Sequence, residues 1–276
     1  MTDSVSGAST QEDEAAALAL LRHGTLEPEG LLAEASNATI RAVISLEGVT
    51  ARCIYKPVRG ERPLWDFPDG TLAGRELAAY LVSAAAGFDV VPPTVVRDGP
   101  LGPGACQLWI EDAHSDQVEP LIGFVPADEL PDDWLPVAEA EGPGGRPYLL
   151  AHADDPRLAT IAAFDAVVNN ADRKGGHVLV TRTGRVYGID HGVCFHTEDK
   201  LRTVLWGFAE RSFDDPVRER LRRVEGALGA KLAGALREHL TSAEIEALRR
   251  RVRRLLDSGR YPLPSGNWPA LPWPPL

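Results

Sequence analysis

The first part of the chain consists of short hydrophobic runs that alternate with polar residues and are bounded by turn-forming residues. This pattern predicts five strands, at residues 30–35, 39–46, 49–55, 90–97 and 106–110. Between the third and fourth strands, hydrophobic residues recur at helical spacing and predict a helix over residues 72–85. A shorter helix is expected at residues 14–21. The N-terminal part should therefore be a small sheet accompanied by helices.

The second part of the chain is mainly helical in its pattern. Hydrophobic residues at helical spacing predict helices at residues 158–168, 199–209, 217–228, 230–239 and 242–256. Two short β runs, at residues 178–181 and 185–189, are separated by a short turn and predict a hairpin. Residues 111–155 are rich in proline, glycine and acidic residues and give no clear element. The proline-rich tail, residues 261–276, is expected to pack as an extended strap through its tryptophans.

Strands followed by helices predict an α+β fold. We expect a disordered N-terminus at residues 1–13, a β-rich N-terminal lobe at residues 14–110 and a mainly helical C-terminal lobe at residues 111–276. A chain of 276 residues is long enough to give two lobes a proper core.

Charge and cysteine content limit the classes of function. The net charge of −11 argues against non-specific binding of nucleic acid. The three cysteines are far apart and odd in number, which favours a reducing compartment over a disulfide framework. No long apolar run suggests a transmembrane span or a signal peptide. A cytoplasmic protein is therefore expected.

Lysine is rare in this chain. Only four of the 29 basic residues are lysines, a usage that suggests a GC-rich genome such as that of an actinobacterium. Where arginine is the usual cation, a lysine is more often required for its own chemistry. Lys56 ends an apolar strand and is followed by Pro57, and Lys174 lies in the loop after the helix at residues 158–168.

That loop and the hairpin after it hold the most informative residues. Asp172, Lys174 and His177 precede the predicted hairpin, and Asp190 follows its second strand in the sequence Ile-Asp-His-Gly. Two carboxylates therefore reach the same end of one hairpin. A site that holds Mg²⁺ and activates a hydroxyl needs one carboxylate near the acceptor and another on the metal.

This arrangement resembles the catalytic loop and metal-binding turn of protein-kinase-like phosphotransferases. The short forms Asn-Ala-Asp-Arg and Ile-Asp-His-Gly are most similar to type II phosphatidylinositol 4-kinases, HipA-like kinases and the actinobacterial branch of phosphatidylinositol 3- and 4-kinase-like proteins. The resemblance implies a two-lobed protein-kinase-like fold. One position departs from the pattern, because His177 stands where the family has a metal-binding Asn, which puts a second metal site in doubt.

For the N-terminal lobe, the resemblance implies a nucleotide site. Lys56 would neutralise the α- and β-phosphates of ATP, and Glu76 would pair with it. The first hairpin would contact phosphates through Ser36 and Asn37, although Ser-Asn is also common in a plain turn. Likewise, Lys56 can be an edge-strand lysine in solvent, and Glu76 can simply favour a helix N-terminus. The adenine-reading hinge would involve three consecutive residues, Gln107, Leu108 and Trp109, which can equally belong to a core strand.

For the C-terminal lobe, the resemblance implies the catalytic roles. Asp172 would orient the acceptor hydroxyl, Lys174 would contact the transferred phosphate, and Asp190 would bind Mg²⁺. His177 can ligate a metal, which would favour Mn²⁺, or can cap the loop backbone. Arg173 is expected to pair with a carboxylate of the same loop.

The sequence thus favours an ATP-dependent phosphotransferase acting on a hydroxyl of a protein or small molecule, with Mg²⁺ or Mn²⁺. A lipid headgroup is a further acceptor class, because the arginines at residues 249–254 offer a surface for peripheral membrane contact. Three alternatives stay open: a nucleotide-binding pseudokinase, a nucleotidyl transferase on the same fold, and an unrelated hydrolase.

Overall fold

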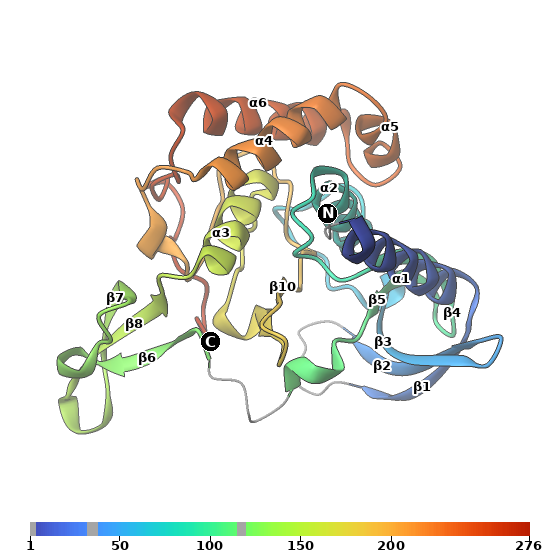
Figure 1. The fold of residues 1–276 in the computed structure, drawn as a ribbon, viewed down its shortest axis with the longest axis horizontal. Coiled ribbons are helices and arrows are strands. Elements are labelled where there is room, and N and C mark those ends of the chain that lie inside the picture. Colours follow the sequence, from blue (N-terminus) through green and yellow to red (C-terminus); the bar gives the residue numbers. More distant parts are fainter. Residues whose placement is uncertain (1–3, 32–37, 115–119) are drawn as a thin grey trace.

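The structure, a computed structural model, describes residues 4–31, 38–114 and 120–276. Strands β1–β5 and helix α1 lie on one side of the molecule, and a smaller sheet of β6–β8 lies on the other (Figure 1). Helices α4 and α6 run across the top, with α3 beneath them (Figure 1). The predicted α+β class, with a β-rich N-terminal part and a mainly helical C-terminal part, is confirmed.

The larger sheet is antiparallel with the strand order β1-β2-β3-β5-β4. Its strands are β1 (Thr25–Leu31), β2 (Ile40–Leu46), β3 (Val49–Pro57), β4 (Thr94–Gly99) and β5 (Gly102–Leu108). Strands β2 and β3 are joined by a two-residue turn, Glu47 and Gly48, both at positive φ, which suits the twist of a tight hairpin. Strand β4 starts later than the predicted residue 90 because Pro92 and Pro93 have no N–H to donate to a ladder.

Helix α1 (Ser4–His23) packs against this sheet and begins within the segment expected to be disordered. Leu20 and Leu21 share a buried cluster with Ile44 and Val95. Helix formation is cooperative, so a segment anchored by tertiary contacts can propagate the helix toward the N-terminus. The sequence pattern detected only the anchored part, residues 14–21.

Helix α2 (Leu72–Ala86) matches its predicted span closely. It begins where the Thr71 hydroxyl accepts a hydrogen bond from the Gly74 N–H, and it ends at Gly87 in the left-handed conformation. The Glu61 carboxylate accepts the N–H groups of the first two helical residues. These caps fix the position of the helix that carries Glu76.

The C-terminal core surrounds α3 (Pro156–Val168), which is buried on nearly all sides. Helices α4 (Asp215–Leu228), α5 (Leu232–Leu236) and α6 (Ser242–Ser258) follow. Helix α4 begins two residues before its predicted span and α6 ends two residues after its own, whereas α5 is shorter than the predicted 230–239. The predicted helix at residues 199–209 is wrong: only the short 3₁₀ turn Trp206–Phe208 forms there. Backbone N–H groups of residues 202–204 instead donate to Asn170, Ala270 and Arg173, so this segment runs extended beside the predicted catalytic loop.

Residues 111–155, which gave no clear pattern, contain a second antiparallel sheet of order β6-β8-β7. Its strands are β6 (Ile122–Pro126), β7 (Trp134–Glu141) and β8 (Pro147–Ala153). The register of β7 against β8 shifts between Pro136 and Ala138, which breaks the alternation that a sequence pattern needs. This sheet is therefore hard to recognise from sequence alone.

The predicted hairpin is confirmed as β9 (Val178–Val180) and β10 (Val186–Gly188). The tail of residues 261–276 forms neither helix nor strand. The expected packing through its tryptophans is wrong for Trp273, which is 86% exposed, whereas Trp268 is partly buried. The Ala270 carbonyl accepts hydrogen bonds from the Thr203 N–H and the Trp206 indole, and the Pro275 carbonyl accepts from the Gly175 N–H. Within the described ranges, no helix is long and apolar enough to cross a membrane.

The packing of α1 on the sheet leads to a stability prediction. Leu21 is fully buried, whereas Leu31 on β1 is 71% exposed. Leu21→Ala should lower the free energy of unfolding by about 2–5 kcal/mol because it leaves a cavity in a packed core. The matched control Leu31→Ala should change it by less than about 0.5 kcal/mol. Urea denaturation of both variants checks this, and equal losses would show that α1 is not anchored as described.

Candidate active site

Lys56, Glu76 and Asp190 meet at one point although they come from β3, α2 and the end of the β9–β10 hairpin. The Lys56 Nζ lies 2.5 Å from Glu76 Oε1 and 2.8 Å from Asp190 Oδ1. Cys53 lies in the core with α1, and because side chains alternate along a strand, Lys56 points to the opposite face. The structure therefore brings together the three residues for which the sequence predicted a phosphate anchor and a metal ligand.

The electrostatics of this group favour full ionisation. Burial opposes charge on Lys56, but the Asp190 and Glu76 carboxylates raise the pKa of its ammonium. In turn, the Lys56 cation holds the pKa of the Asp190 carboxyl well below its usual range. The Asp190 side chain is 50% exposed, so a metal ion can reach it from solvent.

The turn that carries Asp190 is fixed from two sides. Asp190 itself adopts a left-handed φ of 62°, an uncommon conformation for a residue with a side chain. The next residue, His191, donates its N–H to Glu76 Oε2 at 3.0 Å. Glu76 thus holds Lys56 with one oxygen and the Asp190 turn with the other.

His177 approaches Asp190 in the geometry of a metal ligand. Its Nε2 lies 3.4 Å from Asp190 Oδ2, and its Nδ1 lies 3.0 Å from the Asp172 carbonyl oxygen. A carbonyl only accepts, so Nδ1 carries the proton and the Nε2 lone pair faces Asp190. Burial lowers the pKa of His177 to about 4, which keeps the ring neutral at pH 7. A ring oriented by a carbonyl at one nitrogen and open at the other is the usual form of a ligating histidine.

The donor set suits one metal ion that also binds nucleotide. Within the described residues no cluster of three or more His, Cys, Asp or Glu side chains is placed to hold a metal. His177 and Asp190 offer one nitrogen and one carboxylate, so phosphate oxygens and water would have to complete the shell. Mg²⁺ is commonly bound by one or two carboxylates plus substrate phosphates, and the imidazole in this set is a ligand that suits Mn²⁺ better.

Asp172 and Lys174 lie together in the loop between α3 and β9. The Lys174 Nζ is 3.4 Å from Asp172 Oδ2, and Arg202 Nη2 is 3.9 Å from Asp172 Oδ1. Burial raises the pKa of the Asp172 carboxyl, and the two cations act against that shift. Arg202 was missed by the sequence analysis because its segment was expected to form a helix.

Arg173 is the buried centre of this region. Its guanidinium donates to both Asp165 oxygens, at 2.8 and 3.0 Å. It also donates to the carbonyls of His177 and Ile189 and lies 2.8 Å from His191 Nε2. The expected partner within the same loop is wrong, because Asp165 lies on α3. The sequence does mark Asp165 as a candidate partner, because it is the one charged residue in the hydrophobic run of residues 158–168.

The predicted hinge residues form hydrogen bonds within the N-terminal part of the chain. Gln107 is buried, and its amide donates to the Thr94 hydroxyl at 2.8 Å. The Leu108 N–H donates to the carbonyl of Pro93, just before β4, and the Trp109 N–H donates to the carbonyl of Arg52 on β3, so in this conformation they are not available to an adenine edge. Ser36 and Asn37 lie outside the described residues.

A hollow of about 340 Å³ lies between this hinge and the β9–β10 hairpin. Its walls are formed by the last hinge residue, the two residues after it and four hairpin residues, namely Trp109, Ile110, Glu111, Thr181, Thr183, Arg185 and Tyr187. The Arg185 guanidinium lies over the Tyr187 ring, 4.6 Å from its centroid. This hollow is the candidate site for a nucleotide base.

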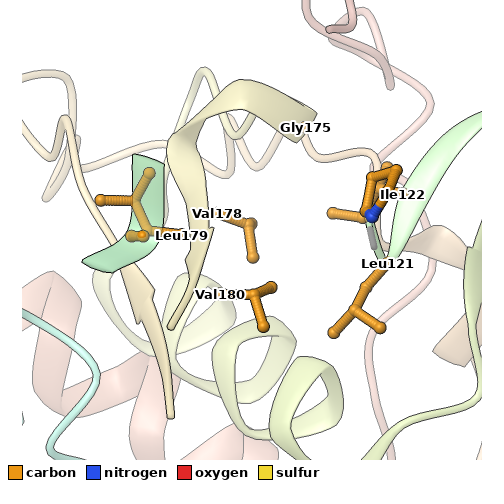
Figure 2. A pocket seen from close by; sticks show the side chains of 8 residues that line it. Leu121, Ile122, Gly175, Val178, Leu179 and Val180 are labelled. Atoms are coloured by element: carbon orange, nitrogen blue, oxygen red, sulfur yellow. The ribbon is translucent and has the colours of Figure 1, made fainter. Parts of the chain in front are cut away.

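A second, apolar cavity of about 180 Å³ lies on the other face of the hairpin. Figure 2 shows Val178 and Val180 pointing toward Leu121, whereas Leu179 between them points away. Leu179 pairs with Tyr187 across the hairpin, so these two side chains share the face that carries the first hollow. Leu179 also lines the apolar cavity, but the two hollows share no lining residue, so the apolar cavity is separate from the candidate nucleotide site.

The buried Arg173–Asp165 pair leads to a second stability prediction. Arg173→Leu should cost about 3–5 kcal/mol of unfolding free energy, because it leaves the buried Asp165 carboxylate without a cation and with only the Asn170 amide to bond to it. The control is Arg211→Leu, which breaks a pair with Asp154 of similar geometry but half exposed, and should cost less than about 1 kcal/mol. Denaturant titrations of both proteins compare the costs. Similar values would mean that burial does not set the strength of the pair.

Comparison with known proteins gives no matching family model. Among solved structures, the Golgi casein kinase matches with a TM-score of 0.48 and 13% identity over 90% of this chain and 74% of that chain. The Helicobacter pylori proinflammatory kinase CtkA matches with a TM-score of 0.44 and 10% identity, over 87% and 94% of the respective chains. Likenesses this distant say nothing about activity, so the functional argument depends on the site geometry.

A much stronger match is found in sequence. Protein Rv2133c of Mycobacterium tuberculosis is 49% identical over 262 residues, which cover 93% of this chain and 94% of the relative. Identity and coverage this high show common descent along nearly the whole chain. The chain therefore belongs to the same protein family as Rv2133c of Mycobacterium tuberculosis.

Proposed function

We propose that this protein is an ATP-dependent phosphotransferase that transfers the γ-phosphate to a hydroxyl group. The observation that carries the proposal is the meeting of Lys56, Glu76 and Asp190. A partly buried strand lysine held by a helix glutamate, beside a half-exposed carboxylate, is what binding of a metal-bound triphosphate requires. In this proposal the nucleotide binds between the N-terminal lobe, residues 14–110, and the C-terminal lobe, residues 111–276.

Nucleotide binding would exchange partners within this group. The Lys56 ammonium lies 2.8 Å from the Asp190 carboxylate. Oxygens of the α- and β-phosphates would replace Asp190 as partners of that ammonium. Asp190 would then be free to bind Mg²⁺ or Mn²⁺ together with His177. A bound metal would neutralise the charge that develops on the phosphates during transfer. The base would enter the hollow between Trp109 and the hairpin, with Tyr187 on its wall.

Asp172 and Lys174 would act on the acceptor. As the acceptor oxygen attacks the γ-phosphorus, the bond from that phosphorus to the leaving ADP oxygen breaks and the hydroxyl proton passes to Asp172. Lys174, 3.4 Å from Asp172, would contact the transferred phosphate and stabilise its charge. The more specific resemblance to type II phosphatidylinositol 4-kinases and HipA-like kinases stays a prediction, as does the acceptor class.

A nucleotide-binding pseudokinase is the second candidate. His177 stands where protein-kinase-like phosphotransferases have an Asn, which favours a pseudokinase because Mg²⁺ prefers oxygen ligands to imidazole. Such a protein would bind ATP and act as a regulator or scaffold without transferring phosphate.

Labelled ATP distinguishes these functions. The protein is incubated with a cell extract, Mg²⁺ or Mn²⁺, and ATP labelled in either the γ- or the α-phosphate. Label from the γ-position on the acceptor supports phosphoryl transfer, with the α-label left in ADP, whereas label from the α-position on the acceptor supports nucleotidyl transfer. Binding of ATP with no labelled product in either metal would favour the pseudokinase.

Substitution of the two central residues gives a direct prediction. Lys56→Ala and Asp190→Ala should each reduce ATP-dependent transfer by about a hundredfold or more. The first removes a cation that would bind the phosphates, and the second removes a ligand of the metal that would bind them. Lys56→Ala should mainly weaken nucleotide binding, and Asp190→Ala should mainly weaken metal dependence. The matched controls are Lys231→Ala and Asp257→Ala, which replace exposed residues of the same types. Normal turnover in either site variant, with an unchanged melting temperature, would show that its assigned role is wrong.

His177 gives a prediction about metal preference. His177→Asn should keep or improve the use of Mg²⁺ and reduce the preference for Mn²⁺, because an amide oxygen replaces an imidazole nitrogen. His177→Ala should lose activity with both metals. Steady-state kinetics of the three proteins in each metal measure this. Since burial lowers the pKa of His177 to about 4, protonation should not compete with metal at ordinary assay pH. Identical metal dependence in all three proteins would leave His177 as a structural residue of the loop.

A further inference from the structure

Arg202 lies beside the candidate acceptor site but is not needed for transfer from ATP itself. It comes from the extended segment after the Asp190 turn, and its Nη2 is 3.9 Å from Asp172 Oδ1. Lys174 already supplies a cation for the transferred phosphate. A second cation near Asp172 makes that carboxylate a weaker proton acceptor. The position of Arg202 therefore calls for another explanation.

Arg202 does not form a structural ion pair of the kind seen elsewhere in this protein. In the pairs Arg173–Asp165, Arg211–Asp154 and Arg254–Asp199, two guanidinium nitrogens contact the carboxylate at 2.8–3.0 Å. The contact between Arg202 and Asp172 is a single one and exceeds hydrogen-bond distance. Arg202 is therefore near Asp172 without being bound to it.

The Arg202 side chain is nevertheless held firmly. Its Nε donates to the Ala171 carbonyl at 2.6 Å, and its backbone N–H donates to the Asn170 carbonyl. The guanidinium carbon lies 5.7 Å from the centroid of the Trp268 ring, in the tail. Among the described residues, no hydrogen bond uses the two terminal nitrogens of Arg202. A fixed guanidinium with both terminal nitrogens open is suited to a two-point contact with an oxyanion.

The neighbouring cation, Lys200, is not available for this role. It is 3% exposed, and its Nζ bonds to Asp66 at 3.0 Å. It also lies over the Trp268 ring, 4.2 Å from the centroid. Lys200 therefore supports the tryptophan against which Arg202 rests, and Arg202, with a side chain that is 26% exposed, is the cation that a ligand can reach.

We propose that Arg202 binds an anionic group of the acceptor, so that the acceptor is a hydroxyl compound with a phosphate or carboxylate close to the reacting hydroxyl. This inference rests on the proposed phosphotransferase function and narrows its acceptor. The hydroxyl faces Asp172 while the oxyanion occupies the terminal nitrogens of Arg202. The short separation of these two groups requires that hydroxyl and oxyanion be a few bonds apart. A neutral protein side chain would leave Arg202 without a partner.

Matched probes that differ only in the oxyanion test this specificity. Full-length protein is loaded with Mn²⁺ and a non-hydrolysable ATP analogue, and binding of glycerol and glycerol 3-phosphate is measured by calorimetry. Glycerol 3-phosphate should bind at least about tenfold more tightly, the size expected for hydrogen bonds to a charged group. Vesicles of phosphatidylcholine with and without phosphatidylglycerol form a separate arm, because that lipid carries the same hydroxyl and phosphate in its headgroup. Binding to the vesicles that contain phosphatidylglycerol, and not to free glycerol 3-phosphate, would assign the oxyanion to a lipid.

Variants of Arg202 connect the preference to this residue. Arg202→Gln should abolish the preference and Arg202→Lys should keep part of it, with the affinity for the ATP analogue unchanged in both. A preference that survives Arg202→Gln would overturn the inference. So would a wild-type protein that binds the analogue but neither the phosphomonoester nor the lipid. If wild type fails to bind the analogue at all, the proposed function itself is wrong and the inference falls with it.

Discussion

The buried ion pair between Arg173 and Asp165 is the interaction on which the candidate site depends. Neither side chain is exposed, and Asp165 belongs to α3, the helix at the centre of the C-terminal core. From this fixed point the guanidinium reaches the carbonyls of His177 and Ile189. One residue therefore ties the loop before the hairpin to the turn after it. Because an unpaired charge here would be very costly, the two segments stay together wherever the protein is folded.

A chain of contacts leads from this pair to the N-terminal sheet. Ile189 precedes Asp190, whose carboxylate bonds to Lys56, and Glu76 holds both Lys56 and the N–H of the residue after Asp190. The N-terminal and C-terminal parts thus meet where the Glu76 and Asp190 carboxylates share the Lys56 ammonium. Removing Lys56 leaves both carboxylates without their cation, so the group is expected to act as a unit. Binding of a charged ligand is the natural way to rearrange it.

The sequence predicted the fold class and pointed to the residues of the candidate site because their signals are local. Lysine is rare in this chain, and Lys56 ends an apolar strand, while Asp190 follows a recognisable hairpin. The sheet of β6–β8 was missed because prolines and a register shift interrupt its alternation. Arg202 was missed for a different reason: its segment has helical spacing, yet long-range hydrogen bonds to the loop and the tail hold it extended. Contacts between distant segments leave no periodic trace in a sequence.

The most direct test of the central claim is pulsed electron paramagnetic resonance of Mn²⁺ bound together with a non-hydrolysable ATP analogue. If Asp190 and His177 hold a metal that also binds phosphate, the spectrum should show hyperfine couplings to both phosphorus and a histidine nitrogen. The nitrogen coupling should vanish in His177→Asn, and metal binding should be lost in Asp190→Ala. Mn²⁺ that shows no phosphorus coupling, or that binds equally well to Asp190→Ala, would contradict the account.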